Sequence, residues 1–499
     1  MKNRLRILMV ASEMVPFAKA GGLADVLGAL PIELKKFGHD VRVIIPKYSS
    51  VNDRIHSVEL FKRFVGVPLG NEEEWCAIYR THIREDVPVY FVDHNWFYLR
   101  EGIYHDNYMN DYQDNPRRFG FLSKVALQFC KEISFKPDVI HVHDWPTAVI
   151  PAFLKTLLSD DPDLAGSASL LTAHNLMHQG IYPRDNFPLL DLEWRYFHDD
   201  VFKSYDSINL LKGGIYFADL VNTVSPGYAK TVLDPVDSTG LAPYLAQKGY
   251  NFVGVLNGVD YDVWSPEKDT FIPAQYSMQD RRGKVICKRD LQKTFLLDQD
   301  EQIALIGVIG RFVPQKGFHL LAQVIQKIVT DMHIQFVILG TGDNDLENYF
   351  MSLPATFPAR VGYHLGFNDE LAHLIEAGSD FFLMPSLFEP CGLNQIYSLR
   401  YGTLPIVRAT GGLDDTIINY DELTGEGTGF KFFDASAQAL YYTVGWAIST
   451  YYDRPAHLEQ MIQQAMAQDF SWQKSAQDYN RLYQVAILNH RNWMLGNRI

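Results

Sequence analysis

Two short segments with the same pattern, Gly-Gly-Leu-x-Asp, have a composition that could bind an anion. KAGGLADV begins at Lys19, ATGGLDDT begins at Ala409, and each follows an apolar run and opens a helical pattern. A Gly-Gly turn lets the backbone approach a ligand closely, and the N–H groups at a helix start attract negative charge. The alternative is an ordinary glycine-rich turn. Neither copy is a GxGxxG fingerprint, which weakens a dehydrogenase interpretation. The repeated residues are Gly21, Gly22, Leu23 and Asp25, and Gly411, Gly412, Leu413 and Asp415.

Charged side chains follow two apolar runs of the second half. Arg311 and Lys316 lie in GRFVPQKGF, in a chain whose net charge is −14, so they suggest a local phosphate clamp. The alternative is a charged surface turn. Glu389 lies in SLFEPCGLNQ and precedes Pro390, which favours an extended backbone. Its carboxylate could bind sugar hydroxyls or stabilise developing positive charge, or it could simply favour the start of the next helix.

Histidines follow two apolar runs of the first half. HVHDW begins at His141 and TAHNLMHQG begins at Thr172. The spacing gives weak support for a metal, and a hydrogen-bonded core histidine is the commoner role for any one of them. The position of His174 at a strand end favours substrate contact. DND at Asp343–Asp345 resembles a metal-binding DxD, but after GTG we interpret it as a helix N-cap.

Composition limits the class of protein. The 499 residues are 47% hydrophobic, which excludes a fold dominated by disorder. The excess of acidic residues makes broad nucleic-acid binding unfavourable. Four cysteines without a CxxC give no disulfide scaffold and little support for structural zinc, so a reducing compartment fits best. The start, MKNRLRILMVASEM, is better interpreted as a buried strand than as a signal peptide, and no apolar run is long enough for a membrane helix.

Most candidate strands are continuous apolar runs separated by helical segments, which predicts parallel strands buried on both faces and two α/β open sheets. A boundary is expected near Gly254–Asp260, in VGVLNGVD. The first half contains Ile7–Ser12, Val41–Pro46, Val87–Asp93, Val139–His143, Leu170–Ala173 and Leu220–Thr223, and the second half contains Ile303–Ile309, Ile334–Leu339, Tyr363–Leu365, Phe381–Met384 and Pro405–Val407.

Two long polar segments, Asn95–Pro116 and Thr231–Gly249, show neither period and are predicted to be functional loops or surface insertions. The first of them and the residues after it are rich in aromatics, which suit carbohydrate stacking; a hydrophobic cluster beneath a loop is an equal alternative. These aromatics are Trp96, Phe97, Tyr98, Tyr104, Tyr108, Tyr112, Phe119 and Phe121.

The motifs KAGGLADV, HVHDW, AHN, LNGVD, GRFVPQKG, LFEPCGLNQ and TGGLDD occur in this order. Together they resemble the bacterial glycogen synthase and plant starch synthase family, which transfers glucose from ADP-glucose. The resemblance extends from about Ile7 to Tyr483. KxGGLxDV and FEPCGL are specific as a pair, although neither is alone.

The resemblance implies an α/β GT-B fold, with two Rossmann-like domains facing across a deep cleft and a C-terminal helix crossing back to the first domain. We expect an acceptor-side domain at residues 1–255, a nucleotide-sugar-binding domain at 256–470 and the returning helix at 471–499. The implied reaction is retaining transfer of glucose to the non-reducing end of an α-1,4-glucan, with neither a metal nor another cofactor.

The resemblance also implies residue roles. Catalytic roles fall to His174, Arg311, Lys316 and Glu389. Contacts to the donor fall to Lys19, Gly21, Gly22, Asp25, Asn257, Cys391, Gly392, Leu393, Thr410, Gly411, Gly412 and Leu413. Acceptor-side positions are Glu13, Asp144, Tyr112 and Asn115, the last two in the stretch that ends at Phe121.

Two positions differ from related patterns. Many retaining GT-B enzymes carry a second Glu eight residues after the first, where this chain has Tyr397, in agreement with the glycogen and starch synthase branch. Phe367 stands where some bacterial members have Tyr, which leaves the nucleotide preference open.

The leading interpretation is therefore a cytoplasmic enzyme, more in keeping with a bacterial protein than with a processed plastid one, whose partners are ADP-glucose and a glucan rather than nucleic acid or a membrane. Use of UDP-glucose, or of both donors, is the close alternative. A catalytically idle glucan-binding protein is the alternative from another class. A dehydrogenase and a phosphorylase with a pyridoxal cofactor are more distant.

Overall fold

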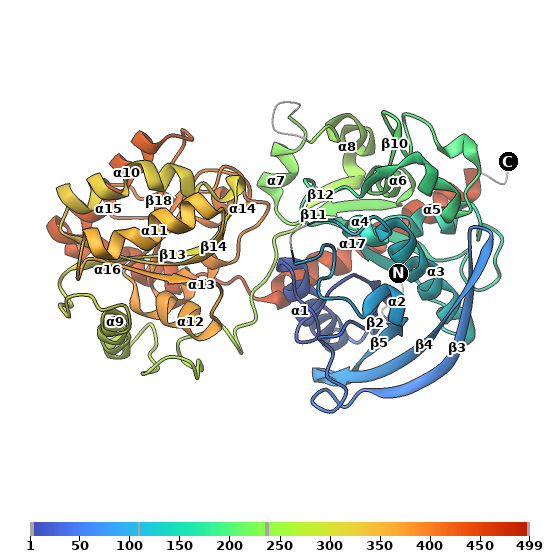
Figure 1. Ribbon diagram of the computed structural model, residues 1–499, viewed down its shortest axis with the longest axis horizontal. Coiled ribbons are helices and arrows are strands. Elements are labelled where there is room, and N and C mark those ends of the chain that lie inside the picture. Colours follow the sequence, from blue (N-terminus) through green and yellow to red (C-terminus); the bar gives the residue numbers. More distant parts are fainter. Residues whose placement is uncertain (1–3, 108–109, 235–238, 497–499) are drawn as a thin grey trace. The chain divides into compact units, whose positions relative to one another are not determined.

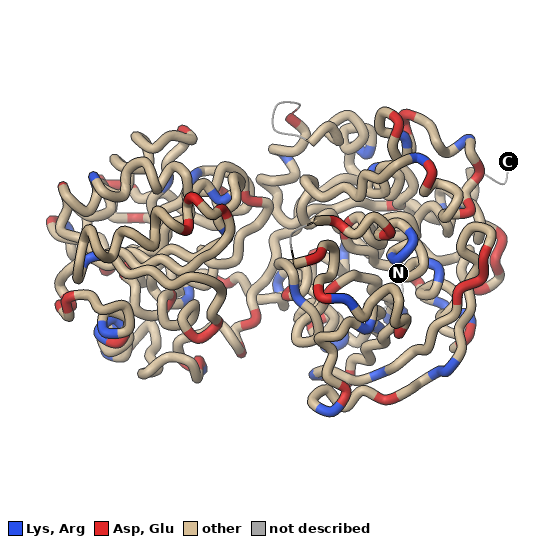
Figure 2. The backbone as a smooth tube through the Cα atoms, viewed as in Figure 1, with Lys and Arg blue, Asp and Glu red and all other residues tan. Residues whose placement is uncertain are grey.

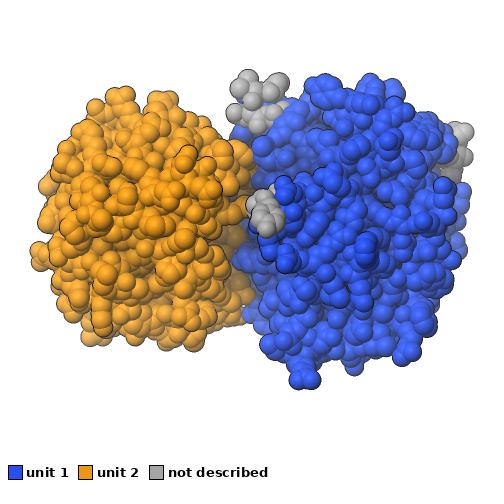
Figure 3. Space-filling view, in the orientation of Figure 1, with its two compact units in different colours: residues 1–224, 229–258, 472–499 blue, residues 225–228, 259–471 orange. Residues whose placement is uncertain are grey.

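The computed structural model describes residues 4–107, 110–234 and 239–496. The chain forms two compact units (Figure 3). Unit 1 contains the chain up to Val224, residues 229–258 and the C-terminal segment from Trp472, and unit 2 contains Ser225–Tyr228 and Val259–Ser471. Apart from the short segment Ser225–Tyr228, the chain enters unit 2 at Val259, inside the range Gly254–Asp260 indicated by the sequence. It returns to unit 1 after Ser471.

The main sheet of unit 1 has nine strands within the described residues, in the order β12-β11-β7-β6-β1-β2-β5-β4-β3. Seven of these are parallel, and β3 and β4 form an antiparallel hairpin at one edge. The strands are β1 (Arg6–Val10), β2 (Asp40–Pro46), β3 (Glu59–Leu69), β4 (Glu72–Ile83), β5 (Val87–Asp93), β6 (Val139–His143), β7 (Ala168–Ala173), β11 (Leu220–Thr223) and β12 (Phe252–Gly254).

Helices flank this sheet, and a small antiparallel sheet of order β8-β10-β9 lies in the same unit (Figure 1). The helices are α1 (Gly22–Lys36), α2 (Asn95–Tyr98), α3 (Asn115–Glu132), α4 (Asp144–Thr147), α5 (Ile150–Lys155), α6 (Leu210–Phe217), α7 (Pro226–Thr231, which begins in unit 2), α8 (Ala242–Lys248) and α17 (Trp472–Gly496). The small strands are β8 (Ile181–Pro183), β9 (Lys203–Ser204) and β10 (Ser207–Asn209).

Unit 2 is built on a parallel sheet that has six strands in the described part of the chain, in the order β15-β14-β13-β16-β17-β18. Figure 1 shows this sheet with α10 and α15 on one side and α9 and α12 on the other. The strands are β13 (Ala304–Phe312), β14 (Ile334–Gly342), β15 (Val361–Leu365), β16 (Phe381–Met384), β17 (Leu404–Arg408) and β18 (Phe430–Phe432). The helices are α9 (Arg282–Thr294), α10 (Phe318–Asp331), α11 (Asn344–Thr356), α12 (Asp369–Gly378), α13 (Asn394–Tyr401), α14 (Gly411–Thr416), α15 (Ala437–Asp453) and α16 (Pro455–Met466).

The predicted parallel strands are confirmed, because each apolar run coincides with a strand, and the residues of most of these strands are buried. The exception is β15, where the predicted run Tyr363–Leu365 is partly exposed. The hairpin β3–β4 was missed. Its sequences, ELFKRFVGVPL and EEEWCAIYRTHI, carry many charged residues because much of this edge is exposed. A buried-strand pattern therefore does not detect it. Figure 2 shows the acidic residues at its turn, where Glu72 and Glu74 pair with Arg117 of α3.

The aromatic-rich segment is mostly a buried cluster rather than an exposed platform. Phe97, Tyr98, Phe119 and Phe121 are at most 2% exposed, whereas Trp96 is 77% exposed. The cluster beneath the loop, one of the two alternatives left by the sequence, is therefore the structure of these four side chains. Tyr108 lies outside the described residues.

Helix α17 returns to unit 1, as predicted, and packs beside α1 and against β6, β7 and β11. Its residues Tyr479, Tyr483 and Ala486 are fully buried in the core that also contains the strand residues Ile7 and Met9. The described helices include none that is both long and apolar enough to cross a membrane.

A buried polar chain attaches α17 to the sheet. Thr172 donates its hydroxyl proton to Asn222 Oδ1 at 2.6 Å, and this oxygen can only accept. Thr172 Oγ1 must therefore accept from Nε2–H of His141, 2.6 Å away, which leaves Nδ1 of His141 as an acceptor. The Tyr483 hydroxyl, 3.0 Å from this Nδ1, is its donor.

Replacing Tyr483 by Phe should therefore destabilise the protein by about 1–3 kcal/mol, because it leaves a buried histidine acceptor unpaired. The measurement is the midpoint of urea unfolding of unit 1, monitored by hydrogen exchange in α17. Tyr250→Phe, at a fully exposed tyrosine of the same unit, is the control and should leave the midpoint unchanged. Equal midpoints for Tyr483→Phe and the unaltered protein would contradict the proposed donor role of the Tyr483 hydroxyl.

Candidate active site

The sheet of unit 1 brings three predicted site segments to one edge. Strands β7, β6 and β1 are parallel neighbours, so the residues that follow them share the carboxyl edge of the sheet. Glu13 follows β1, Asp144 follows β6 and His174 follows β7. Binding sites of open α/β sheets lie at this edge.

Glu13 holds the first Gly-Gly loop in shape. One carboxylate oxygen accepts from the backbone N–H groups of Ala20 and Gly21 at 2.5 and 2.9 Å, and the other accepts from the Tyr104 hydroxyl at 2.9 Å. Burial raises the pKa of this carboxyl, while these donors oppose the rise. An acceptor-side contact for Glu13 stays a prediction, and the geometry adds a loop-holding role. Tyr104 was not among the predicted site residues; its place in the aromatic segment was the available signal.

The glycines of the first loop border open space. A Cβ built on Gly21 or Gly22 would meet no heavy atom of the described residues within 4 Å. Helix α1 begins at Gly22, where the first N–H groups have no carbonyl one turn earlier to bond. Lys19 lies beside this helix start and pairs with Asp25 at 2.7 Å, with its side chain 49% exposed. An exposed pair of this kind contributes at most about 1 kcal/mol, so an incoming anion can replace Asp25 as the partner of Lys19.

Asp144 fixes the loop that carries His174. Its carboxylate accepts from the backbone N–H of His174 at 2.6 Å, and the backbone of Asn175 also bonds to it. Asp144 itself has φ of 56°, a left-handed conformation that few non-glycine residues adopt. Burial is the largest cause that raises the pKa of Asp144 to about 7, and the nearby charge of Glu13 adds to it.

His174 is held neutral. Burial lowers the pKa of its imidazole to about 3, so it offers a hydrogen bond rather than a charge at neutral pH. Its Nε2 lies 3.0 Å from Nδ1 of His143. Asn257, another predicted donor contact, is 5% exposed, and its Oδ1 is buried without a hydrogen-bond partner among the described residues. Unit 1, rather than unit 2, contains Asn257.

The other two predicted acceptor-side residues are already engaged by the protein. Asn115 is fully buried; it donates to the carbonyl oxygen of Tyr104 and accepts from Arg118. The ring of Tyr112 lies within cation–π distance of Arg100 and Arg118, at 4.8 and 5.0 Å. These contacts give both residues a structural role, and their contact with an acceptor stays a prediction.

Unit 2 brings Lys316 and Glu389 together. Lys316 Nζ lies 2.7 Å from Glu389 Oε2, and the side chains are 24% and 7% exposed. Ser386, which the sequence did not single out, donates to the same oxygen at 3.2 Å. The result is a nearly buried carboxylate next to a cation at the carboxyl ends of β13 and β16.

Close backbone packing sets this geometry. Gly317 has φ of 70°, and a Cβ there would lie 1.9 Å from the carbonyl oxygen of Pro385. Only glycine allows the loop after β13 to lie against the loop after β16 in this way. Leu387 N–H donates to the Gln315 carbonyl at 2.8 Å and completes the contact.

The second Gly-Gly loop packs on the Glu389 loop. A Cβ on Gly411 would lie 2.2 Å from the carbonyl oxygen of Glu389, and one on Gly412 would lie 2.2 Å from that of Cys391. The N–H of Gly412 donates to the Glu389 carbonyl at 3.0 Å, and the N–H of Leu413 donates to Thr410 at 3.0 Å. Two of the amides expected to meet phosphate therefore have acceptors within the protein.

The Cys391–Leu393 backbone also has a support that the sequence did not indicate. Gln395 donates from Nε2 to the carbonyl oxygens of Cys391 and Gly392, at 2.9 and 3.1 Å.

Arg311 is exposed and takes part in no ion pair with the described residues. It is a cation available to a ligand at the same sheet edge as Lys316.

Two other candidates are resolved by the structure. Asp343 caps α11 by accepting from the N–H groups of Asp345 and Leu346, which confirms the N-cap interpretation of DND. Across the part of the chain that is described, no group of three or more His, Cys, Asp or Glu is arranged to hold a metal ion. All four cysteines are buried free thiols.

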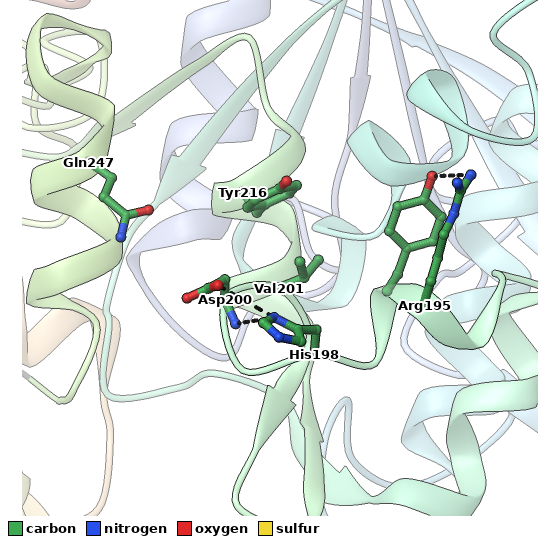
Figure 4. A pocket seen from close by; sticks show the side chains of 7 residues that line it. Arg195, His198, Asp200, Val201, Tyr216 and Gln247 are labelled. Carbon is green, nitrogen blue, oxygen red and sulfur yellow. Dashed lines mark hydrogen bonds and ion pairs between the residues drawn. The ribbon is translucent and has the colours of Figure 1, made fainter.

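A pocket in unit 1 contains none of the predicted site residues. It is lined by residues of the segment 195–201 together with Tyr216 and Gln247 (Figure 4). Its charged groups are paired locally: Arg195 bonds the Tyr196 hydroxyl at 3.0 Å, and His198 lies 3.4 Å from Asp200.

The buried carboxyl of Asp144 predicts a pH-dependent stability. Because its folded pKa is raised from 3.8 to about 7, its contribution to stability is fully present below the unfolded pKa and is lost as the pH rises through about 7. Asp144→Asn keeps the acceptor for His174 N–H and removes the charge. The melting temperature of the variant minus that of the unaltered protein should therefore increase from pH 5 to pH 8. Asp206→Asn, at an exposed aspartate, should give a difference independent of pH. A flat difference for Asp144→Asn would contradict the raised pKa.

Known proteins match the chain along its length. Residues 6–247 match the starch synthase catalytic domain family, and residues 290–467 match the glycosyl transferases group 1 family. Glycogen synthase 1 of Geobacter metallireducens is 46% identical over 97% of each chain. Glycogen synthase of Treponema denticola is 41% identical over 97% of this chain and 99% of its own.

A solved structure agrees with these sequence matches. The catalytic domain of starch synthase IV from Arabidopsis thaliana, bound to ADP and acarbose, superposes with a TM-score of 0.89 at 33% identity, covering 97% of this chain and 99% of that one. The sucrose-phosphate synthase of Thermosynechococcus elongatus, at 15% identity and a TM-score of 0.58, shares the fold. The chain belongs to the glycogen synthase and starch synthase family of GT-B glycosyltransferases.

Proposed function

We propose that this chain transfers glucose from ADP-glucose to the non-reducing end of an α-1,4-glucan, with retention of configuration. The observation that carries the proposal is the Lys316–Glu389 pair at the carboxyl edge of the unit 2 sheet. The bacterial relatives named glycogen synthase support the reaction class. The related starch synthase IV structure, bound to ADP and acarbose, supports a nucleotide-linked donor and a glucan-like acceptor.

The charges match what glycosyl transfer requires. Breaking the bond between glucose and the diphosphate develops negative charge on the leaving group and positive charge on the sugar. Arg311 and Lys316 would stabilise the departing diphosphate, assisted by Lys19 and the start of α1. Glu389 would lie at the glucose, where its carboxylate favours the developing positive charge. Preorganised charges of this kind usually make the largest contribution to catalysis.

Smaller contacts would position the donor. The backbone of Cys391–Leu393 would meet sugar hydroxyls, and Thr410–Leu413 would meet the phosphates through whichever amides remain available. His174 and Asn257 would offer uncharged polar groups from unit 1, with Asp25 close by. Glu13, Asp144, Tyr112 and Asn115 would shape the acceptor side through the loops that they hold.

Retention is proposed to occur on one face of the sugar through a short-lived ion pair. Double displacement would need a carboxylate nucleophile on the opposite face. Tyr397, which occupies the position of the second Glu of related enzymes, is 8% exposed, and its ring stacks on Trp264 with centroids 3.9 Å apart. It is therefore part of the packing around α13. Trapping of a covalent glucosyl-enzyme would overturn the one-face route.

The proposal includes no metal or other cofactor, because Arg311 and Lys316 supply the positive charge that a divalent ion would otherwise bring to the diphosphate. It also places the protein in the cytoplasm of a bacterium, in keeping with its bacterial relatives. Nucleic acid and membranes are not among its proposed partners.

The function is tested by glucose incorporation into a maltooligosaccharide, with ADP-glucose and UDP-glucose supplied side by side and Glu389→Ala as the blank. We expect incorporation from ADP-glucose and at least about 10²-fold less in the blank, because Glu389 would act on the developing charge. Preferred use of UDP-glucose would overturn the donor assignment. Glucan binding without incorporation from either donor would favour the idle glucan-binding alternative.

Lys316→Ala should lower kcat by at least about 10², since one preorganised charge at the leaving group would be lost. Steady-state kinetics with saturating glucan measure the effect, and circular dichroism checks the fold. Lys327→Ala removes an exposed lysine of α10 that pairs with Asp331, and it should leave kcat unchanged. Near-normal turnover of folded Lys316→Ala would remove Lys316 from the catalytic residues.

A further inference from the structure

The imidazoles of His143 and His174 share one hydrogen bond at the carboxyl edge of the unit 1 sheet. His143 ends β6, and His174 directly follows β7. Nδ1 of His143 lies 3.0 Å from Nε2 of His174, and the ring centroids are 5.3 Å apart. Either nitrogen could donate, so the proton between them has to be assigned from the surroundings.

Neither ring carries a charge at neutral pH. Burial is the largest cause that lowers the pKa of both imidazoles, to about 3 for His174 and well below the ordinary value for His143. Each ring therefore has one N–H and one acceptor nitrogen. Once it is known which ring donates to the other, the protonation state of the remaining nitrogen of each ring follows.

The remaining nitrogen of His143 decides between the two arrangements. Nε2 of His143 is buried and has no hydrogen-bond partner in the described part of the chain. If His174 donated, His143 would carry its proton on Nε2, as a buried N–H with no acceptor. If His143 donates from Nδ1, Nε2 holds only an unpaired acceptor. Along protein backbones, orphaned buried N–H groups are rarer than under-satisfied carbonyl oxygens, and we apply the same order to the ring nitrogens. The arrangement in which His143 donates is therefore favoured.

The neighbouring His141 cannot be a hydrogen-bond partner of His143. The ring of His141 lies 4.1 Å from that of His143, centroid to centroid. Both nitrogens of His141 are already used, by Thr172 and Tyr483, so it can neither accept from nor donate to His143.

The outward nitrogen of His174 has no competing bond. Its Nδ1 makes no hydrogen bond with the described residues and is not among the fully enclosed unpaired atoms. With His143 as donor to Nε2, the single proton of His174 sits on this Nδ1. An uncharged N–H then reaches the edge where Asp144 and Glu13 shape the loops.

We propose that His143 is a positioning residue that fixes His174 as the Nδ1–H tautomer, so that His174 presents a neutral hydrogen-bond donor to a hydroxyl of the bound sugar. The identity of this ligand rests on the proposed function, whereas the tautomer does not. A neutral donor suits the site because it binds a hydroxyl oxygen without adding positive charge beside a sugar that itself becomes positive.

The tautomer is tested on the ligand-free, full-length protein labelled with ¹⁵N in histidine. Two-bond ¹H–¹⁵N correlations identify which ring nitrogen carries the proton, and the signals are assigned with His143→Asn and His174→Asn. We expect a proton on Nδ1 in both His143 and His174. A proton on Nε2 of His174 would overturn the proposal, whatever the activity of the protein.

Two variants test the positioning role. His143→Asn can still donate from an amide nitrogen close to the place of Nδ1, and it should keep the His174 tautomer and retain kcat within about threefold. His143→Leu removes the hydrogen-bond donor at similar volume and should lower kcat by about 10–100-fold, by analogy with the loss of a group that orients a metal-binding histidine. The glucan KM should change little, because the hydrogen bond from His174 is needed mainly as charge develops on the sugar.

His82→Leu is the matched control, because this histidine lies on the exposed part of β4. It should change neither kcat nor the glucan KM. Retention of both the Nδ1–H tautomer and full turnover in His143→Leu would overturn the positioning role. If the protein transfers no glucose but shows the expected tautomers, the proposed function fails and the assignment of the protons stands.

Discussion

Buried carboxylates at the ends of parallel strands organise both candidate half-sites. A carboxylate removed from water is costly unless hydrogen bonds or a cation compensate it. Lys316 provides this compensation for Glu389, while backbone N–H groups of the first Gly-Gly loop offset part of the cost for Glu13 and the backbone after β7 offsets part of it for Asp144. Each carboxylate therefore fixes the segment that satisfies it. Loops that would otherwise be free connections become defined surfaces at the edge where open α/β sheets bind ligands.

The repeated Gly-Gly-Leu-x-Asp motif has different physical reasons in its two copies. Gly21 and Gly22 border open space, so the absence of side chains leaves room for a ligand. Gly411 and Gly412 are pressed against carbonyl oxygens of the Glu389 loop, so there the absence of side chains allows one backbone to pack on another. The two Gly-Gly pairs thus have different roles: the pair in unit 1 leaves space for a ligand, and the pair in unit 2 allows two loops to pack together. The first copy keeps more of the anion-binding capacity that the sequence suggested.

Charge is arranged differently in the two units. At its sheet edge, unit 2 carries the cations Arg311 and Lys316 together with the buried carboxylate of Glu389, whereas the sheet edge of unit 1 carries the half-exposed Lys19 and the neutral His174. Burial keeps His141, His143 and His174 uncharged, which turns a potential cationic cluster into a set of directed hydrogen bonds. His141 also forms a hydrogen bond with Tyr483 of α17. The C-terminal helix of unit 1 thereby supports the strand that carries His141 and His143.

The sequence by itself determined the α/β class, the parallel strands, the family and the segments that carry charge, because buried parallel strands are apolar throughout and the motifs follow them directly. It missed the β3–β4 hairpin, whose exposed edge has no such pattern, and it left the aromatic segment undecided. Only the tertiary structure decided that Glu13 and Asp144 hold loops, that Lys316 meets Glu389, and that His143 contacts His174. These partners are separated by as many as 73 residues in the chain. They meet because the order of strands in the sheet, rather than the order in the sequence, sets which strand ends are neighbours.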